Sequence, residues 1–171
     1  MPNPAYCQAM ARYNLWQNVN LITAANTLSK AERQQDRGAF FGSIQRTFSH
    51  LAWGDTIWFS RFAGIQPPDL AIAESDQYLP DWEDFCAYRK DLDQQVLNWA
   101  KDVPADWFDG DLSWYSGAVD RQVAKPKPLL VMQFFNHQTH HRGQIHAMLT
   151  AAGARPGDTD IPFMPDSYNA L

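Results

Sequence analysis

Residues 129–150, LLVMQFFNHQTHHRGQIHAMLT, contain four of the five histidines in this 171-residue chain. On an α-helix, at about 100° per residue, His137 and His141 lie about 40° apart and on the same side as most of the large apolar residues. His140 lies on the flank of that side, and His146 points the opposite way. The stretch therefore predicts a helix that directs two imidazoles, one turn apart, toward the protein core.

Imidazoles on the core side of a helix need partners, because an unpaired buried polar group costs on the order of 1–3 kcal/mol. A metal ion satisfies ring nitrogens directly, and an i, i+4 histidine pair has the spacing found in H-E-x-x-H zinc enzymes. The second position of that motif is Gln138 here, and glutamine cannot accept a proton as the general base of a metalloprotease. The pair therefore indicates a metal site but argues against a metalloprotease.

The remaining histidine, His50, lies in the other strongly apolar helical stretch, IQRTFSHLAWGDTIWF at residues 44–59. It is the histidine left to supply a third ligand from another helix. A buried histidine can instead be an ordinary core residue with hydrogen-bonded ring nitrogens, and the three histidines could hydrogen-bond one another without a metal. The residues alone leave both interpretations open.

Composition predicts a single folded domain over residues 1–171, because 45% of the chain is hydrophobic and seven residues are tryptophan. The 14 basic and 19 acidic residues give a net charge of −5, so we expect neither nucleic acid nor a membrane as a partner. Cys7 and Cys86 form no CxxC motif, and the first ten residues lack the charged and apolar regions of a signal peptide. We therefore expect a cytoplasmic protein.

Helical periodicity predicts four long helices, at residues 4–28, 39–62, 81–101 and 129–150. A polar connection at 29–38 and a long crossover loop at 64–79 separate the first three. Before the last helix, the short pieces DLSWY and VDRQVA flank Ser116 and Gly117, which predicts an extended segment or hairpin. The expected fold is an all-α four-helix bundle, and its long connections permit an up-down-down-up order.

Several aromatic residues lie where they could line a substrate cleft. They are Trp53, Trp58, Trp114 and Tyr115. Aromatic side chains in this number also occur as ordinary core or interface residues. The sequence does not choose between these roles.

Three motifs give the chain a resemblance to a known family. They are YNLWQN at residues 13–18, RTFSHLAWGD at 46–55, and NHQTHHRGQIHAMLTAAGARPGDTDIPFMP at 136–165. In this order they resemble the DinB/YfiT-like family of metal-binding four-helix bundles over nearly the whole chain. The most specific element is HxxHHRGQ followed by a glycine-containing turn and an Asp-Ile tail.

The resemblance implies that His50, His137 and His141 hold a divalent metal. It further implies the up-down-down-up order, a frequent homodimer, and a metal that is zinc or nickel, with manganese or iron as alternatives. Members of the family include thiol-dependent S-transferases and isomerases that use low-molecular-weight thiols such as bacillithiol or mycothiol. A small-molecule substrate is the corresponding expectation.

Two functions are compatible with these residues. The first is a metal-dependent enzyme, either a thiol-dependent S-transferase or a hydrolase, because a divalent ion held by three neutral imidazoles can activate a thiol or water. In it, His140 is a candidate for proton transfer and Gln144 for a hydrogen bond beside the metal. The second is a non-catalytic metal-binding dimer in a stress response, which a fourth protein ligand such as His140 would favour.

Overall fold

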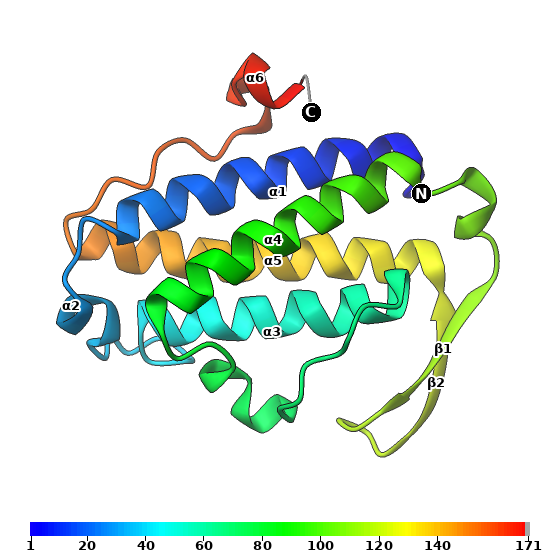
Figure 1. Cartoon of the computed structure of the whole chain (residues 1–171), viewed down its shortest axis with the longest axis horizontal. Coiled ribbons are helices and arrows are strands. Elements are labelled where there is room, and N and C mark those ends of the chain that lie inside the picture. The colour runs from blue at the N-terminus through cyan, green and yellow to red at the C-terminus, as the bar shows by residue number, and fades with distance from the viewer. Residues whose placement is uncertain (170–171) are drawn as a thin grey trace.

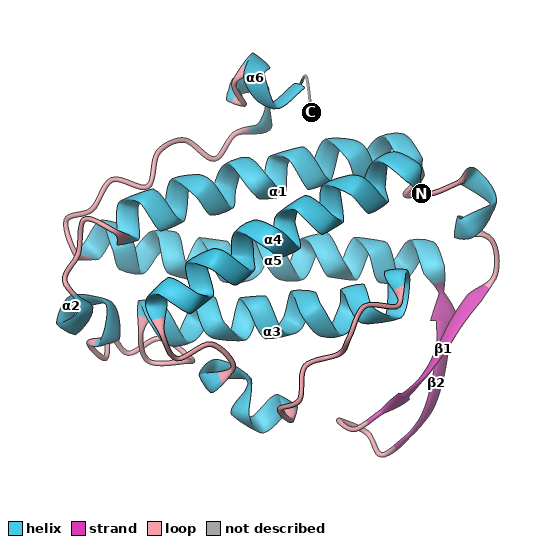
Figure 2. Cartoon of the chain, viewed as in Figure 1, coloured by secondary structure: helices cyan, strands magenta, loops and turns pink. Residues whose placement is uncertain are grey.

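The structure, a computed structural model, describes residues 1–169 and is mostly helical with one two-stranded sheet (Figure 2). Four long helices lie alongside one another (Figure 1). They are α1 (Pro4–Ala25), α3 (Ile44–Ala63), α4 (Trp82–Asp102) and α5 (Lys127–Ala151). Helix α1 packs against α4 and α5, and α3 packs against α5 and α4. The predicted class, mostly helical with a short extended or hairpin segment before the last helix, is therefore correct.

The shorter elements lie between and after the long helices. They are α2 (Lys30–Gln34), η1 (Ile72–Gln77), η2 (Ala105–Phe108), β1 (Asp111–Ser116), β2 (Arg121–Pro126), η3 (Ile161–Phe163) and α6 (Asp166–Asn169). Strands β1 and β2 pair antiparallel, with Trp114 opposite Val123, so the predicted hairpin is present. The predicted polar connection and crossover loop contain the short helices α2 and η1, which apolar periodicity does not predict.

Helix α3 begins later than predicted. The side chain of Ser43 accepts a hydrogen bond from the backbone N–H of Arg46, which makes Ser43 the N-cap and excludes residues 39–43 from the helix. Phe40 is consequently not on a helical face and is 86% exposed. At the other end Gly64 adopts φ 72°, the left-handed conformation that glycine takes without strain, and ends the helix.

The interior contains two apolar clusters separated by a polar layer. One cluster packs around Phe48, Phe85 and Leu149, and the other around Phe59, Val96 and Phe134. Along each long helix the change from one cluster to the other occurs near the middle. Buried polar residues occupy that level on all four helices, namely Asn14, Asn18, Asp55, Arg89, Asp93, Gln138 and Arg142.

Arg89 is at the centre of this polar layer and is 1% exposed. Its guanidinium donates to Asp55 on α3 at 2.5 Å and pairs with Asp93, one turn along α4, at 2.8 Å. The amide of Asn18 on α1 also donates to Asp93, at 2.9 Å. Arg142 of α5 donates to the side chain of Asn14, which in turn donates to Asp93. One connected network therefore joins all four long helices.

Within residues 1–169, no helix has the length and hydropathy that crossing a bilayer requires.

Replacing Arg89 with methionine is expected to destabilise the fold by about 3–5 kcal/mol, because two buried carboxylates would lose their counter-charge. The free energy of unfolding in urea measures this change. Lys90→Met, the exposed neighbour on the same helix, is the matched control and should change the free energy by less than about 0.5 kcal/mol. Similar values for the two variants would show that the network contributes little.

Candidate metal centre

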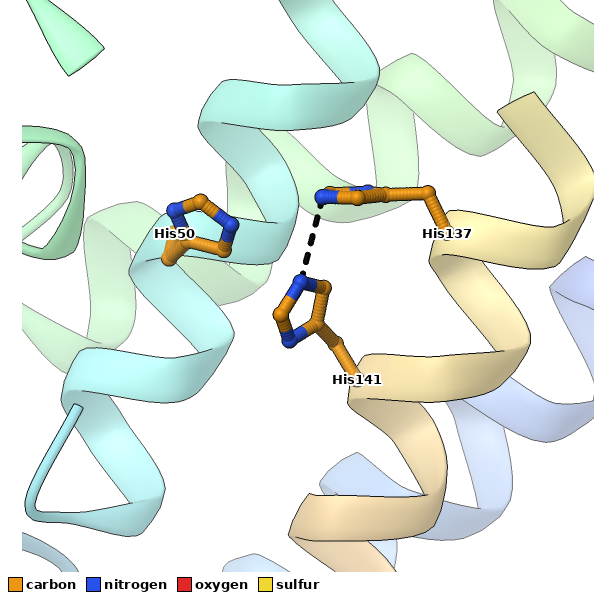
Figure 3. Close-up of side chains that lie close together, drawn as sticks. All are labelled: His50, His137 and His141. Carbon is orange, nitrogen blue, oxygen red and sulfur yellow. Dashed lines mark hydrogen bonds between the residues drawn. The ribbon is translucent and has the colours of Figure 1, made fainter. Parts of the chain in front are cut away.

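Helices α3 and α5 bring three histidines together. His50 projects from α3, and His137 and His141 project from successive turns of α5, so that the three imidazoles converge between the helices (Figure 3). One ring nitrogen from each residue can be chosen so that all three lie within 4.8 Å of one another. These are the three residues expected as ligands, and their arrangement could hold a metal ion.

Hydrogen bonds fix the orientation of two of these rings. Nδ1 of His141 lies 2.8 Å from Oε1 of Gln144, and because an amide oxygen only accepts, Nδ1 carries the proton. Nε2 of His141 therefore carries no proton, and its lone pair points toward the other histidines. Nδ1 of His50 lies 2.8 Å from Oγ of Ser75, in η1. Partners of this kind orient the imidazole ligands of metal sites.

Two features of the ring nitrogens at the centre of the cluster are those expected where a cation binds. Nε2 of His137 and Nε2 of His141 are 3.1 Å apart, so at least one of them must carry a proton or both must share a positive partner. Nδ1 of His137 is buried without a hydrogen-bond partner among the described residues. A metal ion on a nitrogen of His137 would use a polar group whose burial is otherwise costly.

The three imidazoles are held in their neutral form. Burial, followed by the nearby His141 and His137, lowers the pKa of His50 to about 3. Burial is also the main cause that lowers the pKa of His137 and of His141 to about 4. Neutral imidazole is the form that binds a metal, so the site needs no deprotonation near pH 7.

Gly54 makes room for the His137 ring. A Cβ atom at this position would lie 2.5 Å from Cε1 and 3.1 Å from Nδ1 of His137. Gly54 is one turn along α3 from His50, so the two positions face α5 together. The absence of a side chain at Gly54 thus allows α3 to approach close enough for both helices to contribute histidines.

An open cleft of about 660 Å³ lies against the three histidines. Its remaining lining comes from the loop before α3, from η1 and from α5: Phe40, Phe41, Ile72, Ala73, Ser75, His140 and Gln144. Phe41 stacks on His50 with ring centroids 4.0 Å apart and planes inclined by 25°. The histidines are therefore accessible from the cleft but shielded on one side by an aromatic ring.

The other residues singled out in the sequence lie around this centre or away from it. His140 is exposed and lines the cleft, with its ring centroid 4.8 Å from that of His141. His146 is outside the cluster, with Nε2 3.4 Å from the carbonyl of Gly157. Of the aromatic candidates, Trp53 lies beside His50 with its ring stacked at 6.3 Å.

Three parts of the site were not anticipated: Phe41, Gly54 and Ser75. Phe41 was assigned to a helix, and Ser75 lies in a segment assigned to a loop. No pattern of neighbouring residues predicts the contacts of Phe41 and Ser75 with His50. Ser75, for example, is 25 residues from His50 in the sequence. Gly54 does have a local signal. A glycine inside a helical pattern, one turn from a candidate ligand, often marks a place where another group packs closely against the helix.

Two comparisons with known proteins point to the same family. A sequence model described as the DinB family matches residues 1–170. The chain is similar to Protein DinB of Bacillus subtilis (strain 168), with 28% identity over 163 residues that cover 86% of this chain and 87% of the relative.

Gly54→Ala is expected to displace the His137 ring and weaken the binding of added zinc on the order of 10–100-fold. Competition with a chromophoric chelator measures the affinity. Gly143→Ala is the matched control, because its Cβ would meet nothing within 4 Å and alanine favours the helix. Unchanged zinc affinity in Gly54→Ala would exclude His137, in this position, from the site.

The metal-free protein is expected to lose stability as the pH falls below about 6.5. The unfolded chain then binds protons at His50, His137 and His141, whereas the folded imidazoles resist protonation down to a pKa of about 3 to 4. Urea unfolding with EDTA near pH 7.5 and 5.5 measures the loss, at most about 1.4 kcal/mol per pH unit for each histidine. Between these two pH values the His141→Ala variant should lose less unfolding free energy than the His146→Ala variant. Equal losses in the two variants would contradict the lowered pKa of His141.

Proposed function

This chain belongs to the DinB family, and on that premise we propose that it is a divalent-metal-dependent enzyme, a thiol-dependent S-transferase or a hydrolase. One observation carries the proposal: three neutral imidazoles converge at the wall of an open cleft of about 660 Å³. Three histidines leave at least one position of a tetrahedral ion for a non-protein ligand. That is the arrangement of catalytic rather than structural metal sites.

His50, His137 and His141 are the proposed ligands. A divalent ion held by them would lower the pKa of a bound thiol or water and so supply a nucleophile near neutral pH. Three imidazole nitrogens suit zinc or nickel, with manganese or iron as alternatives, better than magnesium or calcium, which prefer oxygen. A low-molecular-weight thiol is the proposed cosubstrate in the transferase reaction.

His140 and Gln144 have separate proposed roles. His140 is the titratable side chain that lines the cleft besides the three ligands, and its exposed ring can take a proton from a reacting group and return it. Gln144 acts as a positioning residue, since its Oε1 accepts the Nδ1 proton of His141 and holds that ring with Nε2 toward the other histidines.

The proposed architecture is the up-down-down-up bundle. The direction of the chain in Figure 1 supports it, because α1 and α5 run one way and α3 and α4 run the other. A homodimer acting on a small molecule in the cytoplasm, as the family resemblance implies, is part of the same proposal.

Elemental analysis of the purified protein tests the metal site. We expect about one divalent ion per chain in the wild type and loss of that ion in His50→Ala, His137→Ala and His141→Ala. His146→Ala removes a histidine outside the cluster and should retain the ion. A wild type that contains no metal and takes up neither zinc nor nickel would contradict the proposal.

Cobalt-substituted protein then distinguishes catalysis from simple binding. If the site is open, a small thiol such as mercaptoethanol should add a sulfur-to-cobalt charge-transfer band, and His141→Ala should lack it. If His140 closes the shell, as in the non-catalytic alternative, the thiol should leave the spectrum unchanged until His140→Ala opens the position. The second pattern would favour a metal-binding protein without catalysis.

A further inference from the structure

Arg61 is a cation without an anionic partner. It projects from α3 with Cζ 4.6 Å from the ring centroid of Trp58 and 5.1 Å from that of Trp114. Among residues 1–169 no ion pair or hydrogen bond involves its side chain. Partial burial lowers the pKa of the guanidinium, so placing a charge there without a carboxylate is costly. Such a cost is recovered if an anionic ligand supplies the missing charge.

Arg61 lines a second pocket, of about 400 Å³. The residues that line it come from the C-terminal half of α3, the start of η1 and the β1–β2 hairpin. Trp53, Ile57, Trp58 and Trp114 make it largely apolar. Arg61 is the charged residue in this lining. The pocket therefore combines apolar walls with a single positive group.

The second pocket adjoins the cleft at the histidines. Ile72 lines both, and Trp53, in the second pocket, stacks beside His50 in the first. His50 and Arg61 are eleven residues apart on α3, which is three turns, so both point to the same side about 16 Å apart along the axis. A ligand held at both ends would have to be extended and on the order of 10–15 Å long.

We propose that the cleft and the second pocket together bind one elongated, largely apolar carboxylate, with its carboxyl group on Arg61 and its reactive end at the three histidines. This inference rests on the proposed function, because the histidines are taken to be the reacting centre. A guanidinium pairs with a carboxylate through two parallel hydrogen bonds, and the flanking indoles keep its plane fixed. The apolar walls between the two ends accommodate the body of the molecule, either an alkyl chain or an aromatic ring.

Calorimetric titration of EDTA-treated protein with octanoate and octanol tests the Arg61 end without a metal. We expect octanoate to bind about tenfold more tightly than octanol in the wild type. Arg61→Gln should remove that preference and leave octanol binding unchanged, which also shows that the variant is folded. Arg61→Lys should retain part of the preference.

Arg121→Gln is the matched control. Arg121 is an exposed cation on the hairpin that contributes to the pocket, but it is absent from the lining of the pocket. It should keep the full preference for octanoate. Equal binding of the two probes by the wild type would overturn the proposal. A preference that survives Arg61→Gln would do the same.

Zinc-loaded protein and mercaptooctanoate test whether one ligand reaches both ends. The thiol should tighten binding relative to octanoate, and His141→Ala should remove that gain while Arg61→Gln removes the carboxylate contribution. Thiol binding that is insensitive to Arg61→Gln would overturn the proposal of a spanning ligand. Absence of a thiol gain, with the octanoate preference intact, would instead count against the proposed function and leave the carboxylate site supported.

Discussion

The buried contact of Arg89 with Asp55 and Asp93 constrains the packing of the long helices. A cation enclosed between two carboxylates tolerates little displacement, because each charge depends on the others for compensation in the interior. Apolar contacts are not directional, whereas these charged hydrogen bonds require particular atoms to meet. Arg142 and Asn14 join α5 to the same network, so it ties the helix that carries His50 to the helix that carries the other two histidines. The geometry of the candidate metal centre thus depends on a layer of polar groups that contains none of its ligands.

Much of the fold follows from local sequence signals. The period of apolar residues predicts the four long helices to within a few residues at most ends, and the predicted hairpin is present. The errors occur where a side chain competes with periodicity. Ser43 caps α3 and excludes Phe40 from it, although Phe40 fits the apolar pattern of the predicted helix. Helix α2 was missed because its stability comes from a capping box between Ser29 and Glu32 rather than from an apolar face.

Part of the candidate site could likewise be predicted from local sequence, and part of it could not. The spacing of His137 and His141 is a property of one helix, so their common direction could be read from sequence, and their role as ligands stays a prediction. Contacts between distant segments could not be read in this way. Ser75 meets His50 only because η1 folds back along α3. The alignment of Arg61 with His50 is visible as an eleven-residue interval, but its significance depends on a hairpin whose position no local pattern gives.

The hairpin is joined to α5 without a linker, since β2 ends at Pro126 and α5 begins at Lys127. Two prolines, Pro126 and Pro128, fix φ on either side of this junction. Fixed φ angles at the junction restrict how the hairpin can turn relative to the helix. The position of the hairpin, which lines the second pocket, is therefore set by the first turn of α5, the helix that carries two of the three histidines. A wall of the pocket beside Arg61 and two of the proposed metal ligands thus belong to one continuous segment of the chain, residues 111–151.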